Sequence, residues 1–285
     1  MRISIIIPTF NNLDYLKLIL KSIHDNSKYE HEIIVHVNEG SDGTLDYVNK
    51  KNIKHTYSTE NIGLCSAVNR ATAQSTEIYI MYTHDDMFFC KNWDEFLEKK
   101  INEQKDNLFY LSGKTISDND INYDLKCGVT HDTFDPDIFD KFCNSSKMYD
   151  IQGSHWAPHL IHKDIWARVG GFSEEFDPGD GSDPDLCLKL WNVGVRVFIC
   201  IGDFKVYHFE SVTIRKSSII KNNGTKKFLL KWGFNPRFFR KYYLRGDHRS
   251  VYNGPLSEPN FTLNMFVDLL INKLKFYYYK IFDAK

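Results

Sequence analysis

Adjacent carboxylates follow an apolar segment in the first third of the chain. Residues 77–83 favour a β-strand, and His84, Asp85 and Asp86 come directly after them, before three bulky apolar residues. The pattern predicts a buried central strand that delivers negative charge to a sheet edge. Buried carboxylates need positive charge nearby, and a hard divalent cation bound through oxygen supplies it. Because such a cation completes its shell with water and substrate phosphates, the sequence indicates a nucleotide ligand.

The two aspartates also have a simpler interpretation. A helical pattern runs from Lys91 to Asn102, and Asp85 and Asp86 lie close enough to its start to act as helix caps. The pair alone does not distinguish a cation site from a capped helix.

The segments before this strand must position the carboxylates. Strand patterns at 2–7, 32–37 and 53–57 alternate with helical patterns at 13–24 and 64–74, and the polar turn at 38–44 opens a further short helix. Alternating strands and helices form a parallel sheet, in which polar residues gather at the carboxyl ends of the strands. Ligands of open α/β sheets bind at that edge.

Composition excludes several classes of protein. The chain has 285 residues, enough for one large domain or two close ones, and its net charge of -1 gives no general attraction to nucleic acid. Six scattered cysteines without a CxxC pair indicate neither a zinc site nor a disulfide framework. The N-terminal apolar run is too short for a signal peptide, and no stretch is long enough to cross a bilayer. We therefore expect a cytoplasmic protein, soluble or peripheral at a membrane.

Four segments resemble, in order, the donor-site motifs of a family 2 glycosyltransferase with the GT-A fold. They span about ninety residues and comprise Ser4–Asn11, Asn38–Thr44, Asn61–Gly63 and His84–Asp86. The resemblance implies an α/β fold with a mixed, mainly parallel sheet flanked by helices, followed here by a helical C-terminal extension. It also implies that a nucleotide sugar is the donor substrate.

The resemblance assigns donor contacts to these segments. It implies that Asp86 holds a metal ion bridging the diphosphate, and that the nucleotide contacts Pro8, Thr9, Asn11, Glu39, Asn61, Gly63, His84 and Asp85. Within that set, Thr9 and Glu39 would contact the base, and His84 and Asp85 the ribose and first phosphate. The chain departs from the usual motif at Asn38, at His84 and at Val68, where an acid, an aspartate and an arginine are common.

Residues 170–186 resemble the acceptor-side block of the same family. Gly170–Phe176 matches its GGFDExF-like stretch, and Asp183 falls on the catalytic base, after Ser182 in place of the usual glutamate. Such a base deprotonates the incoming hydroxyl, and one carboxylate in reach implies a single displacement with inversion. By themselves, Asp183 and Asp185 more simply cap a helix expected at 186–193. With the resemblance, Asp185 becomes the expected cap, on the sugar and acceptor side of the site.

Two later residues extend the predicted site. His208 falls where related enzymes return a histidine to the metal, although a lone histidine in an apolar stretch is more often a core residue. Imidazole with carboxylate oxygen suits Mn²⁺, with Mg²⁺ as the second choice. Trp156 either forms the floor of a sugar or acceptor pocket or packs in the core.

The last part of the chain mixes basic and aromatic residues. Such a segment, at 226–249, can lie on an anionic membrane, bind a phosphate-bearing acceptor, bind nucleic acid, or pack its aromatic residues on the catalytic domain. Arg215 and Lys216, just before it, are candidates to close over the diphosphate. A second amphipathic stretch at 261–282 could dock on the body, pair with another subunit or rest on lipid.

The sequence therefore predicts three parts: a donor half at 1–112, an acceptor and catalytic half of the same domain at 113–215, and a basic, aromatic helical tail at 216–285. We expect a metal-dependent inverting glycosyltransferase of polysaccharide biosynthesis that uses a UDP-sugar and a glycan or glycolipid acceptor, without a nucleic-acid partner. Membrane contact and oligomerisation stay open. The alternatives are a non-catalytic sugar- or polyanion-binding module and a sugar nucleotidyltransferase, which normally has a glycine-rich phosphate loop absent from Pro8–Leu13.

Overall fold

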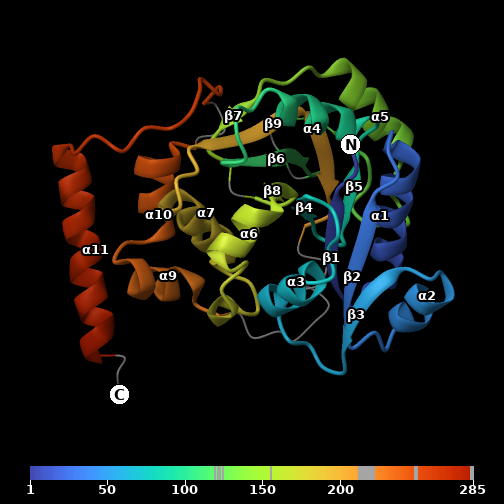
Figure 1. Cartoon of the computed structure of the whole chain (residues 1–285), viewed down its shortest axis with the longest axis horizontal. Helices are drawn as coiled ribbons and strands as arrows, with labels where there is room; N and C mark the ends of the chain where they lie inside the picture. Colours follow the sequence, from blue (N-terminus) through green and yellow to red (C-terminus); the bar gives the residue numbers. More distant parts are fainter. Residues whose placement is uncertain are drawn as a thin grey trace.

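The computed structural model describes residues 1–118, 120, 123, 125–154, 156–210, 222–246 and 250–282. Within these residues, nine strands form one sheet in the order β3-β2-β1-β4-β8-β6-β9-β5, with β7 paired to β9. Helices cover the sheet, and the C-terminal helices lie together at one side of the molecule (Figure 1).

The first half of the sheet is parallel, as the sequence predicts. Strands β1, β2, β3 and β4 pair in parallel, and the helices α1, α2 and α3 connect them. Their bounds are β1 Ser4–Phe10, α1 Leu13–Asn26, β2 Glu32–Asn38, α2 Thr44–Lys50, β3 Lys54–Ser58, α3 Leu64–Thr72 and β4 Tyr79–Tyr82. The carboxyl ends of these strands therefore lie at one edge of the sheet.

The second half makes the sheet mixed. Strand β8 pairs antiparallel with both β4 and β6, whereas β9 runs parallel to β6 and antiparallel to β5. The elements are β5 Met87–Phe89, α4 Trp93–Asn102, β6 Phe109–Ile116, α5 Pro136–Ser145, β7 Ile151–Gln152, β8 His159–His162, α6 Lys163–Val169, η1 Glu174–Phe176, α7 Ser182–Asn192 and β9 Val197–His208. The sheet runs without interruption through the predicted boundary at residue 112, which falls inside β6.

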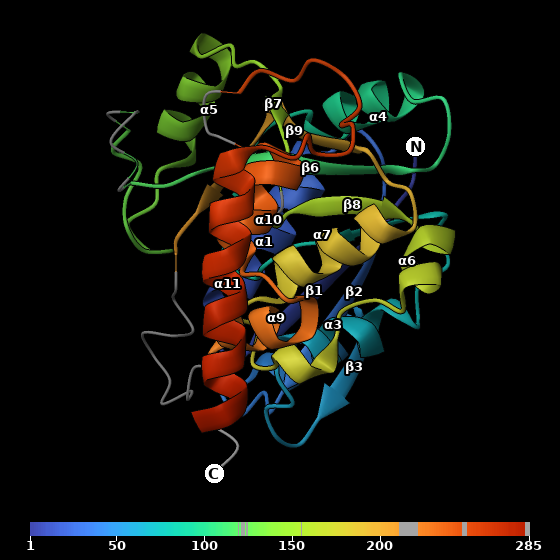
Figure 2. The ribbon, with the colours of Figure 1, turned by 90° about the vertical axis from the view of Figure 1, so that its left-hand side faces the viewer.

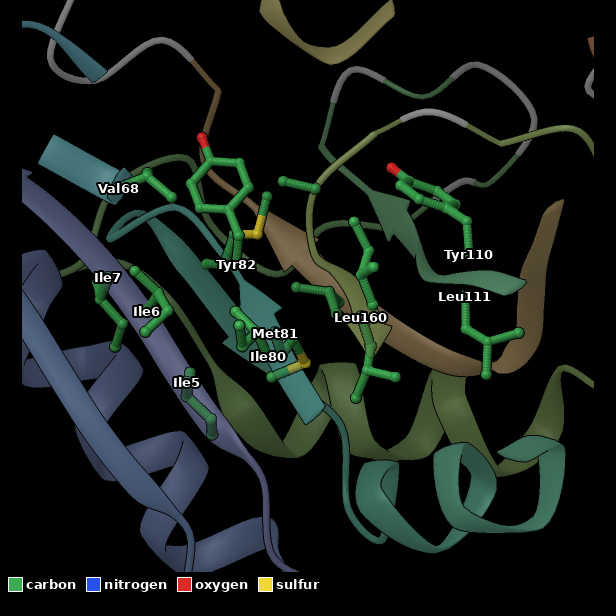
Figure 3. Packing of buried hydrophobic residues seen from close by; sticks show 14 of the residues in the cluster. Ile5, Ile6, Ile7, Val68, Ile80, Met81, Tyr82, Tyr110, Leu111 and Leu160 are labelled. Atoms are coloured by element: carbon green, nitrogen blue, oxygen red, sulfur yellow. The ribbon is translucent and has the colours of Figure 1, made fainter. Parts of the chain in front are cut away.

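The core follows the central strands. Ile5, Ile80, Leu111 and Leu160 are buried on β1, β4, β6 and β8, and Figure 3 shows these side chains close together. Strands that are apolar on both faces must be covered on both, which explains the continuous β-branched run of β1. The apolar pattern of the sequence thus fixes which strands lie at the centre.

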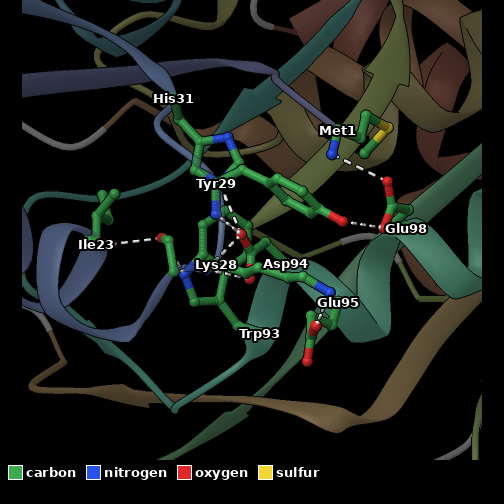
Figure 4. A network of polar contacts seen from close by, with 10 residues as sticks. Met1, Ile23, Lys28, Tyr29, His31, Trp93, Asp94, Glu95 and Glu98 are labelled. Atoms are coloured by element: carbon green, nitrogen blue, oxygen red, sulfur yellow. Dashed lines mark hydrogen bonds and ion pairs between the residues drawn. The ribbon is translucent and has the colours of Figure 1, made fainter.

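A polar network anchors the loop between α1 and β2 to α4. Asp94 accepts hydrogen bonds from the backbone amides of Lys28 and Tyr29, each at 2.9 Å. Glu98 binds the Tyr29 hydroxyl at 2.6 Å and the amino group of Met1 at 2.9 Å (Figure 4). These contacts fix the start of the sheet against α4.

Several predicted boundaries were wrong. The region 113–150, to which the sequence pattern assigns no helix or strand, contains the end of β6 and the helix α5, which Asp135 caps by accepting from the amides of residues 137 and 138. Helix α7 begins at Ser182, four residues before the predicted start, because Pro184 lies in the first turn, where its missing N–H costs nothing. Strand β9 runs to His208, so the predicted metal ligand lies at the end of a strand.

The tail forms helices, of which α9 and α10 contact α7 and α11 packs against α9. They are α9 Gly224–Trp232, α10 Pro236–Phe239, the π-helical turn η2 Arg240–Leu244 and α11 Leu263–Phe282. Figures 1 and 2 show α11 at the outer edge, beside α9 and α10. Among the described residues, no helix is both long and apolar enough to cross a membrane.

Helix α3 joins the two halves of the molecule. Asp177 accepts from the backbone amides of Cys65 at 2.7 Å and Ser66 at 3.3 Å, at the start of α3. Asn69, one turn later, exchanges two hydrogen bonds of 2.9 Å with the backbone of Phe172. The segment that precedes α7 is therefore attached to the first half of the chain through helix α3.

Replacing Asp177 with alanine should lower the free energy of unfolding by about 1–2 kcal/mol, as expected when a carboxylate that satisfies helix N-terminal amides is lost. Denaturant unfolding followed by circular dichroism measures this change. Exposed Glu60, whose side chain forms no hydrogen bond or ion pair among the described residues, provides the control Glu60→Ala, with an expected change below about 0.5 kcal/mol. Equal losses in the two variants would contradict the role of Asp177.

Candidate active site

Two strands that are distant in the sequence bring Asp86 and His208 together. Asp86 lies between β4 and β5, and β5 pairs with β9 so that Met87 lies opposite His208. The His208 Nε2 atom is consequently 3.2 Å from Asp86 Oδ1. The predicted pair is thus adjacent, and it was the antiparallel register that produced the contact.

His84 completes a cluster of three candidate metal ligands. Its Nδ1 atom lies 3.9 Å from Asp86 Oδ1, and one ligand atom from each of His84, Asp86 and His208 lies within 4.8 Å of the others. Burial and the nearby His208 lower the pKa of His84 to about 4, and neutral imidazole is the form that binds metal. Two imidazoles and a carboxylate at these separations fit a first-row divalent cation. The sequence had placed His84 at the ribose and phosphate, and missed its position in this cluster.

The Asp86 carboxylate shifts the pKa values of both His208 and Asp85. Burial disfavours the charged form of His208, but the hydrogen bond and charge of Asp86, together with the charges of Glu210 and Asp85, outweigh burial and raise the pKa of His208. Burial and the Asp86 carboxylate raise the pKa of Asp85 to about 7, while the Thr9 and Asn12 side chains act in the opposite direction. Asp85 therefore lies beside Thr9 at the carboxyl end of β1, as expected for two residues assigned to the same ligand.

The two aspartates do not cap a helix. Strand β5 follows them, and Asn92 is the N-cap of α4. The capping interpretation of Asp85 and Asp86 is therefore wrong.

The loops after β1 and β2 hold each other. Asn11 Nδ2 donates to Glu39 Oε2 at 3.0 Å, and Asn11 Oδ1 accepts from the Ser41 amide at 2.9 Å. Both Asn11 and Glu39 have positive φ angles, of 46° and 58°. Pro8 belongs to β1 and pairs in register with His36. Asn11 and Glu39, two of the predicted donor contacts, thus belong to one hydrogen-bonded group at the sheet edge.

The loop after β3 is shaped by amide side chains. Asn61 Oδ1 accepts from the Gly63 amide at 3.0 Å, and Asn38 Oδ1 accepts from Ser58 Oγ and from the Ile62 amide, each at 3.0 Å. Gly63 has a φ of +88°, and a Cβ atom there would lie 2.3 Å from the Asp177 carboxylate. Asn38 thus positions this loop, which gives a structural role to its departure from the usual acid.

Asp183 lies in the first turn of α7 and does not cap it. The N-cap is Gly181, and no side-chain hydrogen bond caps the helix. The Oδ1 atom of Asp183 is shielded from solvent and has no hydrogen-bond partner among the described residues. Burial raises the pKa of Asp183 to about 7. A carboxylate of this kind is suited to accept a proton near neutral pH.

Tyr82 connects Asp183 to the carboxylates after β4. Burial raises the pKa of the Tyr82 phenol, and the charges of Asp183, Asp86 and Asp85 raise it further. The Tyr82 ring also packs 5.6 Å from that of His84, between centroids. Asp183 and the metal-ligand cluster therefore lie around one tyrosine, although α7 and β4 belong to different halves of the chain.

A cavity of about 930 Å³ opens next to this cluster. His208 and Trp156 both line it, with residues of β6, β7 and the tail. Trp156 is 48% exposed, so the core-packing interpretation of this residue is wrong. Arg215 and Lys216, predicted to close over a diphosphate, lie outside the described residues.

Residues 4–169 match the model of the family described as glycosyl transferase family 2. The chain belongs to glycosyl transferase family 2. The predicted family and enzyme class are thereby confirmed, and the match covers β1 to α6. No curated protein sequence matches the chain significantly.

Solved glycosyltransferases share the fold of this family 2 enzyme. TarS 1–349 of S. aureus, in complex with UDP-GlcNAc, aligns with a TM-score of 0.54 at 16% identity, over 84% of this chain and 75% of that one. GalNAc-T7 with UDP, GalNAc and Mn²⁺ gives 0.57 at 14% identity, over 81% and 47%. The mannosyltransferase PcManGT of Pyrobaculum calidifontis, with GDP-Man and Mn²⁺, gives 0.51 at 16% identity, over 83% and 60%. These similarities confirm the GT-A fold.

One predicted site residue of this glycosyltransferase has a different environment from the one expected. Asp185 is fully buried and accepts from Ser173 Oγ at 2.6 Å and from Trp232 Nε1 at 2.8 Å. The Lys231 ammonium is 2.8 Å from the same carboxylate. Its partners occupy both oxygens, and it neither caps α7 nor lines the cavity described above. We therefore assign it to the attachment of the tail rather than to acceptor binding.

Removal of one ligand should weaken Mn²⁺ binding. Without the His208 imidazole or the Asp86 carboxylate, two candidate ligands are left, so we expect His208→Ala and Asp86→Ala each to raise the Kd for Mn²⁺ at least about tenfold. Isothermal titration with Mn²⁺ alone and with Mn²⁺ plus UDP measures this. His24, whose side chain is 86% exposed on α1, supplies the control His24→Ala. Unchanged Mn²⁺ affinity in the first two variants would exclude the cluster as the metal site.

Proposed function

We propose that this family 2 glycosyltransferase is metal-dependent and inverting, and that it moves a sugar from a nucleoside diphosphate sugar to a hydroxyl of a glycan or glycolipid. One observation carries the proposal. The charges of Asp183 from the second half and of Asp85 and Asp86 from the first all raise the pKa of the same buried Tyr82 phenol. A donor bound at the sheet edge would thus present its anomeric carbon between a base and a metal site.

The donor site is assigned to the loops after β1, β2 and β3. Asn11 and Glu39 form a hydrogen-bonded pair there, and the Asn61–Gly63 turn lies at the start of α3. We propose a UDP-sugar as the donor. Support comes from TarS and GalNAc-T7, which were solved with UDP-GlcNAc and UDP, whereas PcManGT was solved with GDP-Man.

Asp183 is the proposed general base. An acceptor hydroxyl attacks the anomeric carbon while its proton passes to the Asp183 carboxylate, and the bond from that carbon to the diphosphate oxygen breaks. The unpartnered Oδ1 atom is available to accept a proton, and burial raises the pKa of the Asp183 carboxyl to about 7. Attack on the face opposite the leaving group inverts the anomeric centre.

His84, Asp86 and His208 are the residues that would hold the metal. We propose Mn²⁺, with Mg²⁺ as the second choice, since two imidazoles favour the softer ion. A bound divalent cation supplies positive charge that stabilises the departing diphosphate. The hydrogen bond from His208 to Asp86 orients both side chains toward one another.

Asp183→Asn should lower the rate of sugar transfer, or of donor hydrolysis, by about 10²–10⁴-fold, because the amide cannot accept the proton. UDP binding, measured by titration calorimetry, should stay within a factor of about two, since Asp183 is not among the residues assigned to the nucleotide and the substitution keeps the size of the side chain. Release of free UDP from a panel of UDP-sugars measures the rate. With the pKa of Asp183 at about 7, the wild-type rate should rise with pH through that value. An active Asp183→Asn variant, or a non-catalytic binding module that retains UDP without turnover, would overturn the proposal.

We also propose peripheral membrane contact through α11. Met265 and Asn272 are the buried residues of this helix, whereas several large apolar side chains are exposed: Phe266, Leu270, Leu274, Tyr277, Tyr278, Ile281 and Phe282. The helix has three lysines and one aspartate, and that aspartate is 2.7 Å from Lys241. Exposed apolar groups beside basic ones suit an anionic lipid surface.

Leu274→Glu combined with Ile281→Glu should reduce binding to phosphatidylcholine vesicles containing phosphatidylglycerol by about tenfold or more, because two apolar side chains no longer enter the interface. Vesicle sedimentation measures the bound fraction. Val129→Glu, at a position 54% exposed on the catalytic domain, is the matched control. If wild type instead forms a dimer that the double variant abolishes, without vesicle binding, α11 is a subunit contact and the lipid proposal is wrong.

A further inference from the structure

The cavity beside His208 extends away from the proposed donor loops. Gly113, Lys114 and Thr115 of β6 line one side, and Arg237 and Arg240 of the tail line the other. Its described lining residues include none of the loops after β1, β2 and β3. A volume of about 930 Å³ is in the range of a substrate pocket. It meets the candidate metal cluster at His208, where the acceptor must enter.

Positive side chains dominate the cavity. The described lining contains the acids Asp120 and Glu210 and a larger set of basic residues: Lys114, Arg237, Arg240, Lys241 and Arg245. The residues at 237, 240 and 241 have i, i+3 and i+4 spacing, which places them on one helical face, while Phe238 and Phe239 are buried. The tail thus turns its aromatic residues inward and presents its charges to the cavity.

Most of these charges have no anionic partner. Among the described residues, Lys114, Arg237 and Arg240 form no ion pair, whereas Lys241 pairs with Asp268 at 2.7 Å. The Arg245 guanidinium donates to neutral groups, including the Glu258 carbonyl at 3.2 Å. Clustered like charges repel each other, so an arrangement of this kind is stabilised when an anion binds between them.

Close backbone contacts hold the charged segment in place. A Cβ atom at Gly153 would lie 2.1 Å from the Leu244 carbonyl oxygen, and one at Gly246 would lie 2.5 Å from the Gly153 carbonyl oxygen. The backbone amide of Gln152 donates to the Ser250 carbonyl at 2.8 Å. The turn after η2 is therefore fixed against β7, and the basic face has a defined position over the cavity.

We infer that this cavity is the acceptor site and that the acceptor is an anionic polymer, a glycan that carries phosphate or carboxylate groups. This inference rests on the proposed transferase function and narrows its acceptor class. Arg237, Arg240 and Lys114 bind the anionic groups, and exposed Trp156 offers an aromatic face on which a sugar ring can stack. The reacting hydroxyl then lies toward His208.

Binding of defined polymers tests the acceptor class. Fluorescently labelled polyphosphate, polygalacturonate and neutral dextran are titrated into the full chain at two salt concentrations. We expect binding of at least one of the two polyanions, weakened at high salt, and no binding of dextran. Preference between the polyanions distinguishes phosphate from carboxylate recognition. Equal binding of dextran, or tighter binding of a single-stranded oligonucleotide than of either polyanion, would overturn the inference.

Paired variants test the location. Arg237→Ala with Arg240→Ala should weaken polyanion binding about tenfold or more, since each guanidinium loses a charge-assisted contact. Lys50→Ala with Lys51→Ala removes the same charge from exposed positions at the end of α2, outside the cavity, and should leave affinity within about twofold. Equal losses in both pairs would indicate general electrostatic attraction and refute the site.

A second readout separates this inference from the proposed function. Metal-dependent hydrolysis of the donor by the wild-type protein is therefore measured alongside polyanion binding. Wild type that binds polyanions without donor turnover would refute the transferase proposal alone. Wild type that turns over donor but fails to bind either polyanion would refute the acceptor class alone.

Discussion

The attachment of α3 to the segment before α7 is the contact on which the site depends. The first half of the chain supplies Asp85 and Asp86, whereas Asp183 comes from α7 in the second half. Asp177 satisfies amides at the start of α3, and Asn69 holds the backbone of Phe172. Gly63 and Gly171 are required here, since a side chain at either would collide with Asp177 or Asn69. Helix α3 therefore helps to position the proposed base relative to the candidate metal cluster.

Sheet register provides the second constraint. The cluster of His84, Asp86 and His208 exists because β5 is a short antiparallel strand at the end of the sheet. A shift of β9 by one residue would turn the His208 side chain to the opposite face, away from Asp86. The same register forms the hydrogen bond from the Phe209 amide to the Asp86 carbonyl at 3.1 Å, so backbone and side chains of this corner are fixed together.

The first half of the fold was accessible from the sequence because its strands are continuous apolar runs and its helices have apolar residues at helical spacing. Strand β6 was missed because Ser112 and Gly113 interrupt its pattern, although the Asp135–Pro136 start of α5 was a usable capping signal. His84 could not be recognised as a neighbour of His208, since their proximity arises from pairing between distant strands. Nor does any local pattern reveal that Asp185 lies against Trp232, because that contact depends on how the tail folds back.

The Asp185 carboxylate attaches the C-terminal tail to helix α7. This buried carboxylate, two residues after Asp183, is neutralised by Lys231 and hydrogen-bonded by Trp232, both from α9. A buried charge that lost these partners would be costly, so α7 and α9 must change together. Exchanging this C-terminal region for that of a relative would consequently require exchanging α7, the helix that bears the proposed base, as well. A chimera should therefore keep α7 and α9 from the same parent.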